Sequence, residues 1–312
     1  MEINKKEISN WLRQLQDFIC KSLEKADGQA IFEEENWLRE EGGGGRTRII
    51  KNGNVIEIGG VLFSAVEGDA PDFLFKEQQH SNFSVQAEGL TKHQFFATGV
   101  SIVIHPQNPM VPIIHMNIRY FEMTDGSKVT RWLGGGIDLT PHYIFEEDAK
   151  FFHSALKKVC DKHDGKYYSK FKNWADDYFY ISHRKETRGV GGIFFDRLNE
   201  NEEMSFEKNL AFWKEVGEAF APIYTELMLK NKNKFFTEKN KEWQLLRRGR
   251  YVEFNLVYDK GTKFGLETNG RVESILMSLP KTAGWEYDFK ADKNSEEEKT
   301  LNLLKKGVEW SN

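Results

Sequence analysis

Polar side chains that can move protons or bind anions recur at every second position in two apolar runs near the middle of the chain. This two-residue period is typical of a strand, in which successive side chains point to opposite faces. Imidazole, amide, hydroxyl and guanidinium groups gathered on one face can transfer protons and bind an anionic ligand. The side chains predicted to share that face are Ser101, His105, His115, Asn117 and Arg119.

The sequences around these two runs predict how they are placed. The connection PQNPMVP, from Pro106 to Pro112, is rich in turn formers and short enough to return the chain antiparallel. The run WLGGGIDLTP that follows has consecutive glycines, which remove side-chain bulk, and then Asp138. The pattern predicts a wide, shallow ligand floor with the carboxylate of Asp138 at its edge.

A set of histidines could bind a divalent metal ion, although nothing in their spacing demands it. They are too far apart to form a local motif such as HExxH. Proton transfer and substrate positioning remain equally open roles. His153 lies beside the apolar stripe of a predicted helix, so a hydrogen-bonded core histidine is its plainer interpretation. The candidate ligands are His105, His115, His153 and His183.

Hydrophobic periodicity predicts helices and strands that together form an α+β fold with a single large antiparallel sheet and helices on both faces. No compositional break divides the chain, so residues 1–312 are expected to form a single domain. Asp27-Gly28 is a stop signal for the first predicted helix, and Asn52-Gly53 is a hairpin signal between two β-rich runs. Helices are predicted over residues 5–26, 32–39, 146–158, 166–182, 204–230 (with a bend at Pro222) and 301–308, and strands over 49–68, 99–105, 113–121 and 251–258.

Two further segments allow more than one interpretation. EGGGGRTR, residues 41–48, is either a simple linker or a mobile flap whose Arg46 and Arg48 meet anionic substrate groups. It is not a phosphate loop, since the GK[ST] ending is absent. ESILMSLP, residues 273–280, is apolar without alternation, as expected of a doubly covered or subunit-facing segment.

Composition excludes several classes of protein. The formal net charge is −4 and the pI is near 6.1, so no basic field favours nucleic acid as a partner. The 2 cysteines, Cys20 and Cys160, offer neither a disulfide framework nor a CxxC metal motif. The N-terminus has no apolar signal core, and no run approaches the roughly 18 apolar residues that span a bilayer. We therefore expect a cytoplasmic protein without an integral membrane segment.

Several long motifs resemble one family. GVSIVIHPQNP, HMNIRYF and GGGIDLTP, together with NWADDYFYISHRKETRGVGGIFFD and QLLRRGRYVEFNLVYDKGTKFGLETNGRVESILMSLP, are similar to the signatures of oxygen-dependent coproporphyrinogen-III oxidase. The resemblance implies oxidative decarboxylation of two propionates of coproporphyrinogen III to vinyl groups in haem biosynthesis. The products would be protoporphyrinogen IX, CO2 and H2O2. O2 is the co-substrate, and no flavin, haem or nicotinamide motif is present.

The resemblance also implies roles for individual residues. His115 is the implied proton donor, and Asp138 would hold the pyrrole nitrogens. Bacterial members of the family are described as binding a divalent metal at positions matching the four histidines, and eukaryotic members as working without one. Homodimerisation is implied through residues 251–286. The substrate would contact Ser101, Asn117, Ile118, Arg119, Asn269, Gly270 and Arg271.

Two other functions remain as alternatives. A metal-dependent hydrolase would use the histidines to activate water, would contain stoichiometric metal and would act without O2. A non-catalytic tetrapyrrole carrier would bind porphyrinogen without releasing CO2. Anaerobic and aerobic assays that follow CO2 and protoporphyrinogen distinguish all three.

Overall fold

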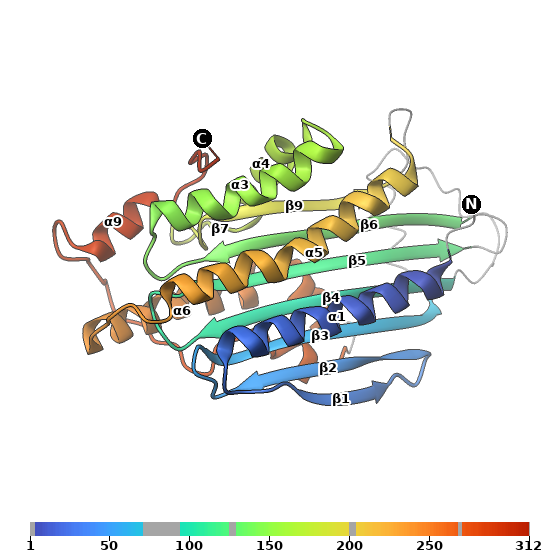
Figure 1. The fold of residues 1–312 in the computed structure, drawn as a ribbon, viewed down its shortest axis with the longest axis horizontal. Helices are drawn as coiled ribbons and strands as arrows, with labels where there is room; N and C mark the ends of the chain where they lie inside the picture. The colour runs from blue at the N-terminus through green and yellow to red at the C-terminus, as the bar shows by residue number, and fades with distance from the viewer. Residues whose placement is uncertain (1–3, 71–93, 125–128, 200–203, 268–269, 312) are drawn as a thin grey trace.

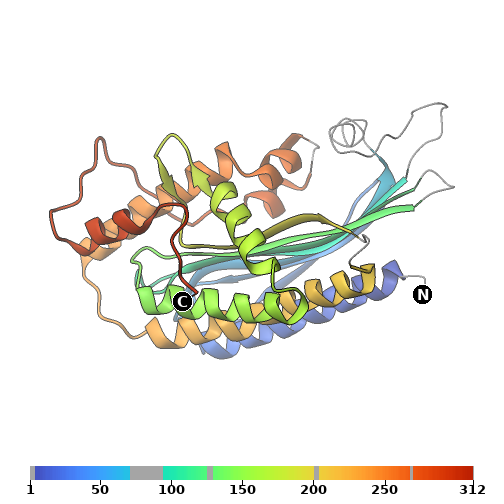
Figure 2. The same ribbon diagram turned by 90° about the horizontal axis from the view of Figure 1, so that it is seen from above.

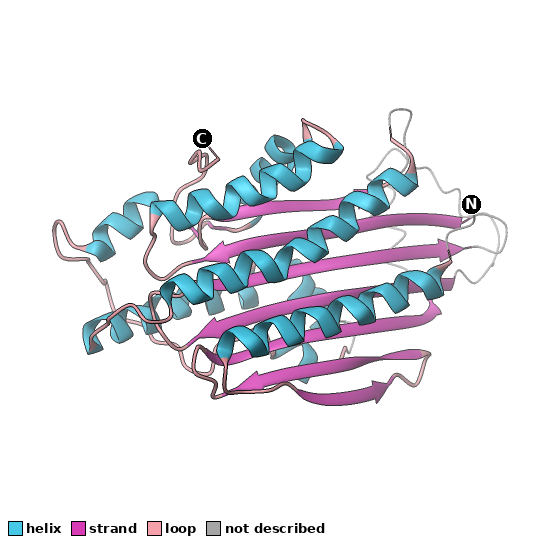
Figure 3. Ribbon diagram, viewed as in Figure 1, coloured by secondary structure: helices cyan, strands magenta, loops and turns pink. Residues whose placement is uncertain are grey.

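The fold is built on one long, twisted sheet in which every neighbouring pair of strands is antiparallel (Figures 1 and 3). The computed structural model describes residues 4–70, 94–124, 129–199, 204–267 and 270–311. The strand order is β1-β2-β3-β4-β5-β6-β9, so chain neighbours are also sheet neighbours apart from the crossover before β9. The strands are β1 (Glu33–Leu38), β2 (Gly43–Lys51), β3 (Ile56–Asp69), β4 (Gln94–Pro106), β5 (Ile113–Thr124), β6 (Val129–Thr140) and β9 (Gly191–Leu198).

Helices cover both faces of the sheet, as the sequence predicted (Figure 2). α1 (Lys5–Asp27), α3 (Glu146–His163) and α5 (Phe206–Asn231) lie on one face. α6 (Glu238–Val257), α7 (Lys260–Glu267) and α8 (Val272–Leu276) lie on the other. The remaining elements are α4 (Tyr167–Tyr178), which packs on β9, the hairpin β7 (Tyr180–Ile181) and β8 (Glu186–Thr187), and α9 (Glu296–Leu303). The α+β prediction is confirmed.

The main core fills the space between the sheet and α1, α3 and α5. The apolar positions of β4 and β5 point into it, because they alternate with the polar positions that point the other way. Trp213 of α5 is completely buried there, and its indole N–H donates to the Gly134 carbonyl of β6 at 3.2 Å. The polar positions of β4 and β5 consequently face α6, α7 and α8.

Residues 251–258 are not a strand, contrary to the prediction. They are the last turns of α6 and the residue after it. The helix begins with a capping box formed by Thr237 and Asn240. Its buried positions Trp243, Arg247, Tyr251 and Phe254 recur with helical spacing over a longer stretch than the two-residue alternation covers.

The predicted helix at 32–39 and the predicted loop at 41–48 are both wrong, since these residues form β1 and most of β2. The turn between them places Gly42 and Gly43 at φ values of 132° and 81°, a region that favours glycine. Arg46 and Arg48 do not form a flap. They point toward α1, where both guanidinium groups bind the Asp17 carboxylate at 2.8 Å.

Other local predictions are confirmed. Asn52 adopts a φ of 54° at the hairpin turn between β2 and β3, and Gly28 ends α1 in the left-handed region. Pro222 lies inside α5. The helix predicted over residues 301–308 is displaced, since α9 spans Glu296–Leu303 and residues 304–308 are not helical. Within the described ranges, no helix is long and apolar enough to cross a membrane.

Candidate active site

The polar side chains of β4, β5 and β6 line up across the sheet on the face covered by α6, α7 and α8. The register pairs Ser101 of β4 with Asn117 of β5, and His115 of β5 with Asp138 of β6. Directly paired residues of an antiparallel sheet point to the same face. Ile118 points to the opposite face and is fully buried in the main core, so only its backbone can contact a ligand on the polar face.

His115 and Asp138 form a hydrogen-bonded pair at the centre of this face. The Nδ1 atom of His115 lies 2.8 Å from Oδ1 of Asp138. Asp138 is only 1 % exposed, whereas the His115 side chain is 20 % exposed. The carboxylate is therefore beneath the surface of the face, not at the edge of an open floor as the glycine pattern suggested.

Arg188, in the loop before β9, is the third residue of this group and also binds Asp138. One terminal nitrogen of its guanidinium donates to both carboxylate oxygens of Asp138 at 2.8 Å, and the other donates to Oδ1 of Asn255 at 2.9 Å. Three aromatic rings surround the guanidinium carbon, with centroid distances of 4.4 Å for Phe179, 4.7 Å for Tyr251 and 4.6 Å for Phe254. Such contacts stabilise a desolvated cation.

These partners determine the charge of Asp138. Burial by itself raises the pKa of this carboxyl group, but the Arg188 guanidinium and the hydrogen bond from His115 outweigh it, so that the pKa is lowered. An ionised carboxylate only accepts hydrogen bonds, so Nδ1 of His115 must be the donor. In the neutral imidazole, Nε2 is then left as the acceptor.

Arg119 extends the polar face toward β9. Its guanidinium binds the carboxylate of Asp196 at 2.9 Å, and its side chain remains 43 % exposed. The pair passes over Gly134, where an added Cβ would lie 2.6 Å from Oδ1 of Asp196 and 2.9 Å from Nε of Arg119. Glycine at this position therefore leaves the space in which the arginine reaches across β6.

Arg271 lies at the other end of the sheet. Its guanidinium binds Glu35 of β1 at 2.6 Å and donates to the Thr47 hydroxyl at 3.4 Å. The neighbouring Gly270 donates its backbone N–H to the Gly265 carbonyl at 2.8 Å. Asn269, also predicted to contact substrate, lies outside the described residues.

A search of known protein families matches residues 7–310 to a family described as coproporphyrinogen III oxidase. The chain belongs to this family. It is 49 % identical over 305 residues to coproporphyrinogen-III oxidase 1, chloroplastic, of Arabidopsis thaliana, which covers 96 % of this chain and 77 % of the relative. It is 44 % identical over 331 aligned positions to the oxygen-dependent coproporphyrinogen-III oxidase of Prochlorococcus marinus strain MIT 9312, covering 99 % and 93 %. The resemblance noted in the sequence is thus confirmed.

The four histidines that the family resemblance suggested as metal ligands do not converge. His153 uses both ring nitrogens within the main core, where Nε2 donates to the Val190 carbonyl at 2.8 Å and Nδ1 accepts from the Tyr168 hydroxyl at 2.9 Å. His105 is fully buried and donates from Nε2 to the Ser278 carbonyl at 2.9 Å. Among the residues that the structure describes, no group of three or more His, Cys, Asp or Glu side chains could hold a metal ion. These residues do not fit a metal centre.

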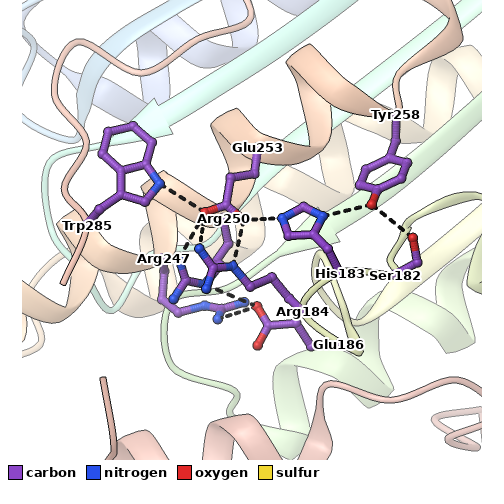
Figure 4. A network of polar contacts seen from close by, with 9 residues as sticks. All are labelled: Ser182, His183, Arg184, Glu186, Arg247, Arg250, Glu253, Tyr258 and Trp285. Carbon is purple, nitrogen blue, oxygen red and sulfur yellow. Dashed lines mark hydrogen bonds and ion pairs between the residues drawn. The ribbon is translucent and has the colours of Figure 1, made fainter. Parts of the chain in front are cut away.

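His183 belongs to a separate polar network at the tip of the β7–β8 hairpin (Figure 4). Its Nε2 lies 2.7 Å from Glu253, and its Nδ1 lies 2.7 Å from the Tyr258 hydroxyl. Glu253 also binds Arg184 and Trp285. Burial raises the pKa of Glu253, but the hydrogen bonds from Arg184 and His183 lower it to about 2 overall. The network joins the hairpin to α6 and the segment at Trp285.

Arg188 and Asn255 are the site residues that sequence reasoning missed. Arg188 stands immediately before the glycines of a buried strand, in KETRGVGGIFFD, which is the signal that could have drawn attention to it. Asn255 was assigned to a strand, so its contact with Arg188 was not foreseeable. Arg188 binds Asp138 of the His115–Asp138 pair, and Asn255 binds Arg188, only because the fold brings β9 and α6 to this part of β6.

Proposed function

We propose that this protein is an oxygen-dependent coproporphyrinogen-III oxidase, which acts in haem biosynthesis. Each of two propionates reacts with one O2 and one proton to give a vinyl group, CO2 and H2O2. The propionate loses its carboxylate as CO2 and a hydride equivalent from the carbon attached to the pyrrole ring, so that the electron pair of the broken C–C bond forms the double bond, and O2 accepts the two electrons of the hydride. The family match over residues 7–310 is the main support for the proposal. The His115–Asp138 pair and the arginines Arg119 and Arg271, on one face of the sheet, give it a chemical basis.

The arginines at the two ends of the polar face suit a substrate with several carboxylates. Arg119 and Arg271 are each held by a carboxylate of the protein, Asp196 and Glu35 respectively. A propionate that displaces these partners makes the same charge-assisted bond to a guanidinium. Substrate binding on this face therefore exchanges internal ion pairs for ion pairs with the ligand.

Asn117 and His115 suit the centre of a porphyrinogen, whose pyrrole N–H groups point inward. The Oδ1 atom of Asn117 is buried and has no hydrogen-bond partner within the described part of the chain, and a ligand N–H would stabilise such an unpaired acceptor. The family resemblance implied that His115 donates a proton, but its free Nε2 is an acceptor in the neutral ring and can first take a pyrrole proton, which raises the electron density available to O2. Asp138 stabilises the resulting imidazolium and acts through His115, because its own oxygens are occupied by His115 and Arg188.

The experiment that tests this function is an assay with coproporphyrinogen III under air and under nitrogen. We expect protoporphyrinogen IX and CO2 only in the presence of O2, and a kcat lowered by about 10²- to 10⁴-fold in the His115→Gln and Asp138→Asn variants. Turnover under nitrogen with stoichiometric metal would favour a hydrolase. Tight binding without CO2 release would favour a carrier. Near wild-type turnover in Asp138→Asn would refute the role given to that carboxylate.

We also propose that the protein is a homodimer that associates through residues 251–286. This region exposes large apolar side chains, at Leu256, Val257, Leu266, Val272 and Trp285. Exposed apolar side chains concentrated in one part of a chain are typical of an interface. Val257→Glu should give a monomer in size-exclusion chromatography with light scattering. Val129→Glu, at an exposed apolar position on β6, is the matched control and should remain dimeric.

A cytoplasmic location is part of the proposal, although the Arabidopsis relative is named as chloroplastic. Fractionation of cells that express the full chain at native level, with immunodetection in each fraction, tests it. Recovery with a membrane or organelle fraction would contradict it.

A further inference from the structure

Arg188 needs a second anchor besides Asp138, and α6 provides it. The guanidinium is buried, with a side chain only 2 % exposed. One terminal nitrogen is directed to Asp138, and the other donates to Oδ1 of Asn255, a residue 3 % exposed. The remaining nitrogen, Nε, has no hydrogen-bond partner among the described residues. The hydrogen bond to Asn255 therefore fixes the rotation of the guanidinium between the three aromatic rings that surround it.

The orientation of the Asn255 amide is itself fixed from the other side. Its Nδ2 donates to the Ser278 hydroxyl at 3.1 Å, so its Oδ1 must face Arg188. The Ser278 hydroxyl in turn donates to the Ile275 carbonyl at 3.2 Å. A continuous chain of hydrogen bonds therefore runs from the end of α8 through Asn255 and Arg188 to Asp138 and His115.

We propose that Asn255 is a positioning residue for the His115–Asp138 pair, acting through Arg188. Its kinetic consequences depend on the function proposed above, whereas its structural consequences do not. Residues on α6 and α8 thereby set the geometry of a proton-transferring group on β5 that they do not touch.

The physical reason is the cost of leaving a buried donor unpaired. Without Asn255, two of the three guanidinium nitrogens would have no acceptor among the described residues, and the Phe179 and Phe254 rings beside them carry no acceptor atom. The guanidinium would then turn to find one. Its two bonds to the Asp138 carboxylate would lengthen, and the carboxylate would lose the orientation that aligns it with Nδ1 of His115. Asp259 and Tyr251 also interact electrostatically with Arg188, but neither is among its hydrogen-bond partners in the described part of the chain.

The test compares Asn255→Ala with wild type in steady-state assays with coproporphyrinogen III. We expect kcat to fall about 10- to 100-fold and KM to change by less than about threefold, because the group displaced is the proton-transferring pair and not a substrate contact. Asn231→Ala is the matched control. Asn231 is an equally buried asparagine on α5 that binds Asp148 at 2.7 Å, so its loss costs similar stability far from the pair.

A second measurement does not depend on activity. The Nδ1 proton of His115, bonded to an ionised carboxylate, should give a downfield ¹H NMR signal that is absent in His115→Gln. We expect Asn255→Ala to broaden or shift this signal and Asn231→Ala to leave it unchanged. If wild type shows no oxidase activity, the proposed function fails, and this signal still decides the role of Asn255.

Asn255→Asp keeps the shape of the side chain and covers the case in which the alanine variant does not fold. Its carboxylate retains the acceptor for Arg188, so we expect kcat to recover most of the loss seen with alanine. Equal kcat values for the alanine and aspartate variants, an unchanged NMR signal, or a rise in KM alone would each overturn the proposal.

Discussion

Mild acid should destabilise this protein well above the pH at which its carboxylates titrate, because His105 and His153 are buried as neutral rings. Burial lowers the pKa of His153 to about 4, although the Val190 hydrogen bond opposes the shift. Burial lowers the pKa of His105 to about 3, against a similar bond to Ser278. Both pKa values are 6.5 in an unfolded chain.

The size of the effect follows from these values. Between pH 6.5 and the folded pKa values, the unfolded state binds more protons than the folded state, so the free energy of unfolding falls as the pH falls. Lowering the pH from about 7.5 to about 5 protonates both imidazoles in the unfolded chain and neither in the fold. Each histidine then costs about 2 kcal/mol, and the two together about 4 kcal/mol. This is a large part of a typical total stability.

Urea unfolding followed by tryptophan fluorescence at a series of pH values measures this effect. We expect His153→Gln to be less stable than wild type at pH 7.5 but to lose about 2 kcal/mol less between pH 7.5 and pH 5. Leu156→Ala is the control, since it removes a buried side chain of the same helix that does not titrate, and it should leave the slope unchanged. Parallel stability curves for wild type and His153→Gln would refute the claim that this imidazole is neutral in the fold.

Three further outcomes are expected. Arg188→Met should lower the free energy of unfolding by about 3–5 kcal/mol in urea titrations, because the buried Asp138 carboxylate loses its guanidinium partner and keeps only the hydrogen bond from His115. Arg184→Met, at an exposed position, should cost less than about 1 kcal/mol. Equal losses in the two variants would contradict this. Gly134→Ala should raise KM severalfold because its Cβ displaces Arg119, whereas Gly165→Ala, which has nothing within 4 Å, should not. Asp196→Asn should lower KM by freeing Arg119, and the difference in KM between this variant and wild type should become smaller at high ionic strength. A raised KM would show instead that the ion pair holds the arginine ready for the substrate.

Local patterns predicted those parts of the fold in which neighbouring residues decide the conformation. The alternation in β4 and β5, the Asn52 turn and the end of α1 at Gly28 are of this kind. The pattern misled where it was short. The alternation from Val252 to Tyr258 is also compatible with a helix, and the buried side of α6 is visible only when Trp243 and Arg247 are included.

The glycines of residues 42–45 are a second case in which a local pattern allowed more than one structure. They indicated a loop because glycine is common in loops. In the sheet they permit a tight turn at Gly42 and Gly43 and then close packing, since an added Cβ at Gly45 would lie 2.3 Å from the Trp37 ring. Whether glycine marks a turn or a close approach depends on which strand lies beside it.

The residue types and spacing by themselves determined that Ser101, Asn117 and His115 share one face of paired strands, that the protein has an α+β fold, and that it resembles one enzyme family. Only the tertiary structure decided what Asp138 contacts. Arg188, in the loop before β9, binds Asp138 directly, and Asn255 of α6 binds Arg188. These residues are distant from Asp138 in sequence, and Arg188 comes close to it because the sheet places β9 beside β6. The charge on a buried carboxylate depends on such partners, because desolvation alone would neutralise it.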